Sequence, residues 1–328
     1  MQTLALGRSG PQVSRIGLGC MGMSDFYGPA NEDESIATIH AAMDAGVTLL
    51  DTGDFYGMGH NEMLIGRALR GKTRQQVLLS VKFGALRTPG GAFAGFDGRP
   101  QAVKNFASYS LKRLGTDYID IYRPARVDPQ VPIEETVGAI ADLIRSGHVR
   151  YAGLSEAGAG TLRRAEAVHP IVDLQIEYSL ASRSLESGIL ATARELGVAI
   201  TAYGVLSRGL LTGTLPQTLP GLRVHMPRFQ GENYQRNLRL VEALAAIARR
   251  KGVTPAQLAI AWVLSRGDDI VPLIGTTRRK GLAEAMQTLS MRLSPEELAE
   301  IEQAVPASAV AGTRYGVEQM AQLDSERG

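Results

Sequence analysis

The chain has 328 residues, of which 44% are hydrophobic and 21% are charged, and its formal net charge is +2. These proportions indicate a globular protein with a large hydrophobic core. The nearly balanced charge argues against nucleic acid as a partner, because nucleic-acid-binding proteins carry a basic stripe and the basic residues here are scattered.

The chain contains one cysteine, Cys20, which excludes an intrachain disulfide and a metal site built from cysteines. The histidines and carboxylates are not gathered at ligand-like positions, so we predict no metal site. The first residues lack the basic and apolar regions of a signal peptide, and no apolar run approaches membrane-spanning length. The sequence therefore predicts a cytoplasmic protein that does not contact a membrane.

Short apolar runs alternate with amphipathic helical patterns over nearly the whole chain. The expected strands are 16–19, 48–51, 77–81, 119–122, 149–154, 174–177, 199–203 and 270–274. The expected helices are 34–45, 61–69, 101–114, 133–146, 185–196, 232–251, 255–265, 279–289 and 295–305. Eight strand–helix units without a break in composition predict an α/β fold, a (β/α)8 TIM barrel, as a single domain over residues 1–328.

Residues 1–16 precede the first unit and are expected to form an N-terminal β-hairpin. Leu4 and Leu6 lie before an Arg-Ser-Gly-Pro turn, and Val13 and Ile16 lie after it. We expect the apolar side of this hairpin to cover the floor of the barrel. Two further loops, 84–99 and 212–229, are long and rich in glycine or proline, and loops of this length usually have a function such as a lid.

The stretch IGLGCMG places Gly17, Gly19 and Gly22 in the G-x-G-x-x-G spacing of a dinucleotide-binding turn. The eight-unit count does not fit a Rossmann sheet, which has about six strands. The next helix also begins too late for its N-terminus to cradle a pyrophosphate. We therefore interpret these glycines as the first strand and loop of a barrel, where small residues let a nicotinamide and a substrate come close.

Polar side chains follow the second and third expected strands, where a barrel carries its active site. Asp51 ends the second strand, Tyr56 follows it by five residues, and Lys82 comes directly after the third strand. A lysine there needs a partner, because a buried unpaired ammonium is costly, and Asp51 is the natural one. The pair would lower the pKa of Tyr56 and let it donate a proton to a carbonyl oxygen. A structural Asp–Lys pair beside a surface tyrosine is the alternative from these residues alone.

The stretch IGTTRRKGLAEA leads from the eighth expected strand into a helix. Free N–H groups at a helix N-terminus, together with Arg278, Arg279 and Lys280, are typical of a phosphate site. The alternative is an ordinary solvated basic turn.

The chain resembles an aldo-keto reductase across essentially its whole length. The resemblance is carried by IGLGCMGMS, LLDTGDFYGMGHNEMLIGRAL, VLLSVKFG, SLKRLGTDYIDIY, VDPQVPIEETVGAI, GHVRYAGLSEA, LQIEYSL, AYGVLSRGLLTG and GTTRRK. It implies an NADP-dependent oxidoreductase that reduces an aldehyde or ketone to an alcohol, or the reverse. By the same resemblance Tyr56 is the general acid, Lys82 tunes it and Asp51 holds Lys82, while the hydride comes from the nicotinamide.

The resemblance also implies where NADP(H) binds. Ser155 and Gln175 match positions that hydrogen-bond the nicotinamide carboxamide, and Tyr203 matches the ring that stacks on it. Arg278 matches a position that meets the 2′-phosphate, which favours NADPH over NADH. The remaining expected cofactor residues are Gly22, Met23, Asp51, Gly204, Leu206, Ser207, Arg208, Gly209, Leu211, Gly275, Thr276, Thr277 and Glu284.

One position departs from the family pattern. The loop after the fourth strand reads YRPARVDP, and Ala125 stands where the family has the histidine of a catalytic tetrad. In one interpretation catalysis survives through the remaining tyrosine and lysine, and Arg123 or a water fills the space of the imidazole. In the other, the chain is a catalytically weakened NADPH-binding sensor or regulatory subunit.

The expected partner is a small-molecule carbonyl compound or alcohol. The expected substrate contacts are Phe26, Tyr27, Tyr56, Arg123 and Ala125. The candidate pocket walls are mostly apolar, which favours an uncharged or aromatic carbonyl compound.

Overall fold

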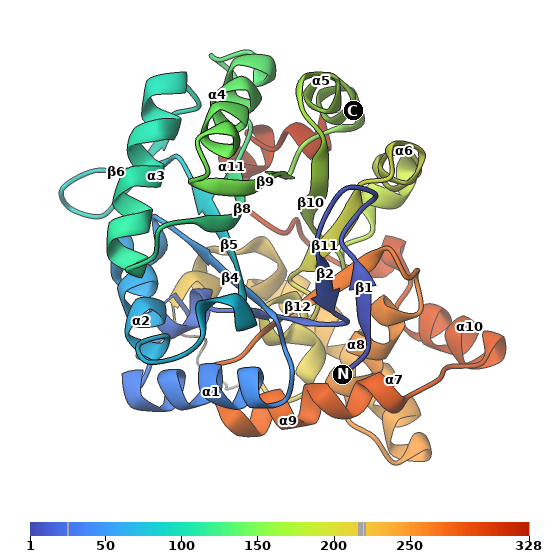
Figure 1. Ribbon diagram of the computed structural model, residues 1–328. Helices are drawn as coiled ribbons and strands as arrows, with labels where there is room; N and C mark the ends of the chain where they lie inside the picture. Colours follow the sequence, from blue (N-terminus) through green and yellow to red (C-terminus); the bar gives the residue numbers. More distant parts are fainter. Residues whose placement is uncertain (25, 216–218, 220, 328) are drawn as a thin grey trace.

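Eight parallel strands close into a barrel at the centre of the molecule (Figure 1). The computed structural model describes residues 1–24, 26–215, 219 and 221–327. The barrel strands are β3 (Gly17–Gly19), β4 (Leu49–Gly53), β5 (Leu78–Phe83), β8 (Ile119–Pro124), β9 (Val149–Ser155), β10 (Ile171–Glu177), β11 (Ala199–Tyr203) and β12 (Ile270–Gly275). Their order around the barrel is β10–β11–β12–β3–β4–β5–β8–β9, so the last strand pairs with the first.

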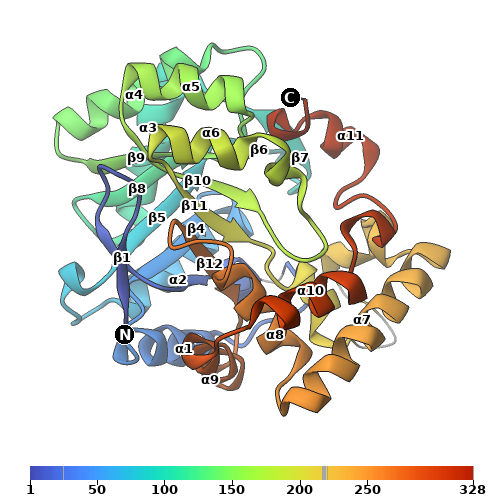
Figure 2. The ribbon, with the colours of Figure 1, turned by 90° about the vertical axis from the view of Figure 1, so that its right-hand side faces the viewer.

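Helices follow the strands and surround the barrel. They are α1 (Glu32–Asp44), α2 (His60–Ala68), α3 (Pro100–Leu114), α4 (Ile133–Arg145), α5 (Ala159–Val168), α6 (Ile189–Leu196), α7 (Gly231–Lys251), α8 (Pro255–Leu264) and α9 (Arg279–Gln287). The chain ends with α10 (Pro295–Ala304) and α11 (Val317–Ala321). Because the barrel closes, α1 and α9 lie side by side although they come from opposite parts of the chain (Figures 1 and 2). The alternation confirms the predicted (β/α)8 barrel.

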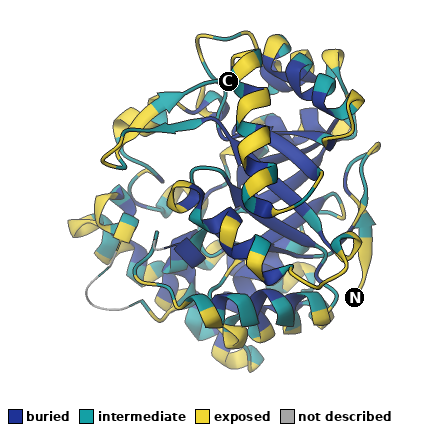
Figure 3. Ribbon diagram, turned by 60° about the vertical axis from the view of Figure 1, so that its left-hand side comes forward, coloured by how far each residue is buried: buried dark blue, intermediate teal, exposed yellow. Residues whose placement is uncertain are grey.

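Burial follows the layers of this architecture, with buried strands at the centre and exposed residues on the outer faces of the helices (Figure 3). In α4, Ile133, Val137 and Ile140 are spaced three and four residues apart and are buried together against the barrel. None of the described helices combines the length and the apolar character that crossing a membrane requires.

The N-terminal hairpin closes one end of the barrel, as the sequence predicts. Strands β1 (Thr3–Ala5) and β2 (Gln12–Ser14) pair antiparallel. Leu6 and Val13 are fully buried in one cluster with Leu49, Ile121 and other side chains of the barrel interior. Figure 2 shows this hairpin at one end of the barrel and α11 near the opposite end.

Two segments differ from the expected elements. Helix α5 lies where no helix was predicted, because its sequence AGTLRRAEAV carries a weak apolar stripe. The expected loop 84–99 contains a small antiparallel hairpin, β6 (Ala85–Arg87) and β7 (Phe93–Phe96). Of the second expected loop, 212–229, residues 216–218 and 220 lie outside the described residues, and the rest forms short turns of 3-10 helix.

We predict that Leu6→Ala lowers the free energy of unfolding by about 2–5 kcal/mol, because it opens a cavity in the closed floor of the barrel. Urea unfolding measures the change. Leu4→Ala is the matched control, since Leu4 is only half-buried in the same hairpin, and it should cost about 1 kcal/mol. Equal losses for the two variants would contradict the role of Leu6 as a plug.

Candidate active site

Asp51 and Lys82 form a buried ion pair at the ends of the neighbouring strands β4 and β5. Lys82 Nζ lies 2.5 Å from Asp51 Oδ1. The other carboxylate oxygen accepts from Ser80 Oγ at 2.8 Å and from Gln175 Nε2 at 2.7 Å. Burial lowers the pKa of Lys82, and the charge of Asp51 opposes that shift. The polar atoms of this carboxylate are therefore satisfied inside the barrel.

Tyr56 lies directly beside this pair. Lys82 Nζ is 5.0 Å from the centre of the Tyr56 ring, and Phe55 and Phe26 pack edge-on against the ring at 4.7 and 5.4 Å. Asn61 links the loop that carries Tyr56 to the first barrel loop, because its Nδ2 donates to the Cys20 carbonyl oxygen at 2.8 Å. The structure thus brings together the three predicted catalytic residues.

The pKa of Tyr56 is shifted in the direction opposite to the one that the sequence predicts. Burial of the phenol, and next the charge of Asp51, hold the pKa of Tyr56 well above its ordinary value. The net shift is therefore upward and opposite to the expected one, because burial outweighs any lowering by the nearby Lys82 ammonium. The phenol is therefore protonated at neutral pH.

Arg123 lies inside the barrel and not in the space beside Ala125. Its side chain is completely buried, and Nη2 lies 3.0 Å from Asp173 Oδ2. The Arg123 side chain fits there because Gly153 has no side chain. A Cβ at position 153 would lie 2.5 Å from Asp173 Oδ1 and 3.1 Å from Arg123 Nε. Thr201 donates its hydroxyl to the same carboxylate. This location does not fit the predicted substrate role of Arg123.

The residues expected at the nicotinamide lie at the ends of the next strands. The Ser155 hydroxyl is buried and has no hydrogen-bond partner among the described residues. Gln175 is on the adjacent strand β10, in register with Ser155, and uses only its Nε2 on Asp51. The Tyr203 hydroxyl donates to Glu156 Oε1 at 2.7 Å and lies 3.1 Å from the Tyr315 hydroxyl.

Two buried carboxylates at this end of the barrel were not predicted as site residues. Glu156 Oε2 lies 2.5 Å from Arg314 Nη2 and accepts from Ser325 Oγ at 2.6 Å. Burial raises the pKa of Glu156, but the charge and hydrogen bonds of Arg314, the charge of Arg126 and the Ser325 hydrogen bond together outweigh it and bring the pKa to about 2. These contacts fasten the C-terminal segment across the strand ends. Glu156 directly follows the buried strand β9, and Glu177 is the last residue of the buried strand β10; a charged residue at the end of a buried strand is the signal that identified Lys82.

Glu177 is the second of these carboxylates and binds two further arginines. Its Oε2 accepts from Arg208 Nη2 at 2.8 Å, and its Oε1 lies 3.4 Å from Arg228 Nη1 and accepts from Ser182 Oγ at 2.7 Å. Burial again opposes ionisation, but the charges of Arg208 and Arg314 bring its pKa to about 2.

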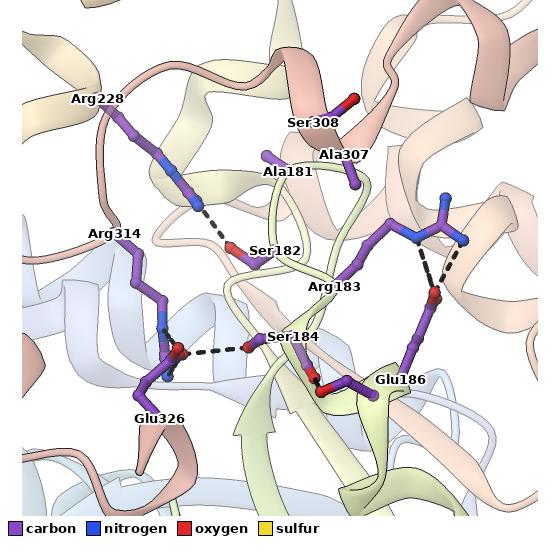
Figure 4. A pocket seen from close by; sticks show the side chains of 11 residues that line it. Ala181, Ser182, Arg183, Ser184, Glu186, Arg228, Ala307, Ser308, Arg314 and Glu326 are labelled. Carbon is purple, nitrogen blue, oxygen red and sulfur yellow. Dashed lines mark hydrogen bonds and ion pairs between the residues drawn. The ribbon is translucent and has the colours of Figure 1, made fainter. Parts of the chain in front are cut away.

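A hollow of about 790 Å³ lies beside these residues (Figure 4). Its lining includes Arg228 and Arg314, which reach Glu177 and Glu156 from that side, together with Arg183 paired to Glu186. None of the predicted catalytic residues lines it, so this hollow is separate from the catalytic group.

The first and last barrel loops lie together, as the closed barrel requires. Gly19 pairs in register with Gly275, and a Cβ on Gly22 would come within 3.4 Å of Thr277. Arg278 caps the N-terminus of α9 and is exposed, as is Lys280, while Arg279 pairs with Glu34 at 2.9 Å. Thr276 Oγ1 accepts the Arg278 backbone N–H.

The loop after β11 has an unusual backbone. Ser207 and Arg208 both have positive φ, at 45° and 55°, as do the neighbouring Gly204 and Gly209. Such conformations in non-glycine residues require support, which the Arg208–Glu177 pair supplies here. Leu211 is buried in the core and Leu206 packs partly against it.

The remaining predicted residues are spread around the mouth. Phe26 contacts Tyr56. The Arg223 guanidinium lies over the Tyr27 ring, 4.6 Å from the ring centre. Met23 is buried in the hydrophobic core. Glu284, within α9, accepts the hydroxyl of Thr254, the N-cap residue of α8, at 2.6 Å.

The closed barrel and its polar strand ends place the chain among the (β/α)8-barrel enzymes, which carry their active sites at this end. A sequence model of the Aldo/keto reductase family matches residues 15–306, and the chain belongs to this family. It is therefore an oxidoreductase from a family that acts on carbonyl compounds with a nicotinamide cofactor.

Named relatives agree with this membership. The chain is 43% identical over 320 residues to the probable aldo-keto reductase 1 of Glycine max, covering 96% of this chain and 92% of that protein. It is similar to the glycerol dehydrogenase AKR11B4 from Gluconobacter oxydans, with a TM-score of 0.83, 28% identity and coverage of 93% and 96%. The holo form of AKR11C1 from Bacillus halodurans gives a TM-score of 0.78 at 28% identity, with coverage of 94% and 97%.

We predict that the Glu156 carboxylate stabilises the fold only above acid pH. Its folded pKa of about 2 lies below the ordinary value of 4.5, so its contribution is complete above the unfolded pKa and is lost as the pH falls toward 2. The free energy of unfolding of Glu156→Gln should lie below that of the wild type by on the order of 3 kcal/mol at pH 7. Urea unfolding at pH 7 and pH 3 should show this gap shrinking in acid.

The control is Glu195→Gln, which removes an exposed carboxylate paired with Arg163. It should cost little at either pH, because a solvent-exposed ion pair contributes little to stability. A gap for Glu156→Gln that did not change between pH 7 and pH 3 would contradict the prediction.

Proposed function

We propose that this protein is an NADP(H)-dependent carbonyl reductase in which Tyr56 is the proton donor. The observation that carries the proposal is the buried group of Tyr56, Lys82, Asp51 and Gln175, in which Asp51 and Lys82 come from adjacent strands and Gln175 reaches Asp51 from across the barrel. No structural role needs a protonated phenol beside an ammonium at this end of a barrel, whereas carbonyl reduction does.

The residues at the strand ends fit a nicotinamide cofactor. The orphaned hydroxyl of Ser155 and the unused amide oxygen of Gln175 match the donor and acceptor needs of a carboxamide. Gly22 lies close to Thr277, where a Cβ would touch its methyl group, and Arg278 with the start of α9 suits a phosphate. When bound, the reduced nicotinamide supplies the hydride to the carbonyl carbon.

The chain's own part is the transfer of one proton. Tyr56 keeps its proton at neutral pH because burial disfavours the phenolate, and it donates this proton to the carbonyl oxygen as the alcohol forms. The phenolate left behind is then stabilised by the Lys82 ammonium, whose position Asp51 fixes. The reverse reaction returns the alcohol proton to Tyr56.

Ala125 supports the second candidate, a weakened NADPH-binding sensor. This residue is buried and brings no hydrogen-bond donor to the place of the family histidine. The absence of one carbonyl-orienting donor costs a factor of about 10²–10³ in rate where nothing replaces it.

We predict that Tyr56→Phe lowers kcat on simple aldehydes by at least about 10²-fold, because the general acid is lost. The Kd of NADPH, measured by fluorescence titration, should stay within about twofold. Tyr122→Phe is the matched control, since its buried hydroxyl donates to the Val103 carbonyl oxygen at 3.1 Å, away from the strand ends.

Two outcomes separate the candidates. If Tyr56→Phe keeps full activity, the proposed mechanism is wrong. If the wild type binds NADPH tightly but turns over none of a broad panel of aldehydes and ketones, the protein is the NADPH-binding sensor and not a reductase.

We predict that Arg278→Met raises the Kd of NADPH about 10-fold and leaves that of NADH within about twofold, because only NADPH carries the 2′-phosphate. Fluorescence titration of both cofactors measures this difference. The control is Arg145→Met, which removes an exposed cation at the far end of α4 and should change neither Kd. An equal loss for both cofactors would assign Arg278 to a part of the cofactor that the two share.

A further inference from the structure

Arg126 lies beside Ala125, where the chain leaves β8 at the mouth of the barrel. Its Nη1 donates to the Ala125 carbonyl oxygen at 2.6 Å, and its Nη2 donates to the Tyr315 hydroxyl at 3.3 Å. The guanidinium also lies close enough to Tyr56 to act on its pKa, in the direction opposite to the larger effect of burial. Geometry also places Arg126 at the same mouth of the barrel as the proposed acid, because the Ala125 N–H donates to the carbonyl oxygen of Phe83, the residue after Lys82, at 2.7 Å.

Arg126 differs from the cations around it in having no carboxylate partner. Three other cations lie against Tyr56, Tyr203 or Tyr315, and each is ion-paired with a buried acid. The pairs are Lys82–Asp51, Arg208–Glu177 and Arg314–Glu156. Arg126 forms no such pair with any carboxylate in the part of the chain that the structure describes, and its hydrogen bonds go to neutral oxygens. The charge of Glu156 acts on Arg126 without direct contact, but that carboxylate is already ion-paired with Arg314.

The guanidinium of Arg126 is also open to a ligand. A guanidinium has five N–H donors, and the contacts above use two of them. Arg123, two residues earlier, has its guanidinium nitrogens sealed inside the barrel, whereas Arg126 is only partly buried. A cation that is half-desolvated and unpaired gains most from an anion that can reach it.

We propose that Arg126 binds a carboxylate group on the substrate, so that the preferred substrates are oxo acids, aldehydes or ketones that carry a carboxylate. The inference rests on the proposed reductase function, because it places this carboxylate next to the carbonyl that Tyr56 protonates. The planar guanidinium suits bidentate contact with a carboxylate. One unpaired cation matches a single negative charge better than a phosphate dianion.

This assignment replaces the expectation of an uncharged substrate. The apolar surroundings remain, since Phe26 and Phe55 pack edge-on against the Tyr56 ring. They suit the carbon skeleton that joins the carbonyl to the carboxylate, and Arg126 supplies the charge at its other end.

The test compares 4-carboxybenzaldehyde with its methyl ester, which has nearly the same shape and no charge. With NADPH, the wild type should show a kcat/KM for the acid that exceeds that of the ester. Arg126→Met should lower the acid-to-ester ratio of kcat/KM by about 10- to 100-fold. Arg126→Lys should recover part of that ratio, because lysine restores the positive charge but not the paired N–H donors of the planar guanidinium.

Arg87→Met is the matched control. Arg87, on the β6–β7 hairpin, also forms no ion pair with any carboxylate among the described residues, and its guanidinium lies 5.9 Å from the Phe55 ring. It should change the ratio by less than about twofold, since it acts only as a distant charge. An equal loss of preference in Arg87→Met and Arg126→Met would overturn the assignment to Arg126.

Binding without turnover separates this inference from the proposed function. Calorimetry with NADP⁺ in place of NADPH measures the Kd of both probes when no reduction can occur. Tighter binding of the acid that disappears in Arg126→Met supports the inference even if the protein reduces neither aldehyde. Equal affinity of the wild type for acid and ester overturns it, even if both are reduced.

Discussion

The buried Asp51–Lys82 ion pair is the constraint on which the rest of the site depends. Two charges inside a barrel are tolerable only when their geometry is fixed and their remaining hydrogen-bonding capacity is filled. Ser80 from the same strand as Lys82, and Gln175 from across the barrel, complete the coordination of Asp51. The position of Lys82 is therefore set by several strands at once, and Tyr56 is placed against a rigid ammonium.

Below this pair the barrel interior is layered. The floor is apolar and closed by Leu6 and Val13 of the hairpin. Above it lies the Arg123–Asp173 pair, for which Gly153 leaves room. Replacing such a pair by apolar residues is often neutral for stability, so its presence indicates a role in fixing geometry beneath the site. It lies under Ser155 and Gln175, two positions further along the same strands.

Periodicity and strand-end chemistry were enough to predict the barrel, the hairpin and the grouping of Asp51, Tyr56 and Lys82. Sequence alone could not distinguish Arg123 from Arg126, because their roles depend on which way each side chain leaves the end of β8. The pairing of Arg314 with Glu156 joins residues 158 positions apart, and only the folded chain reveals it. The pKa of Tyr56 was misjudged because the degree of burial, which dominates it, is a property of the packed structure.

Ala125 and Arg126 both affect how a carbonyl substrate is oriented beside Tyr56. A histidine beside the acid would hold the carbonyl oxygen directly, and Ala125 brings no donor for that task. Holding the substrate at a second point fixes the direction of its carbonyl equally well, because orientation needs two anchors and not two groups on one atom. Arg126, adjacent in sequence and fixed by the Ala125 carbonyl oxygen, is positioned to provide that second anchor. Under this view the loop after β8 has exchanged a contact with the reacting oxygen for a contact with the far end of the substrate, which narrows the substrate range while it preserves the proton donor.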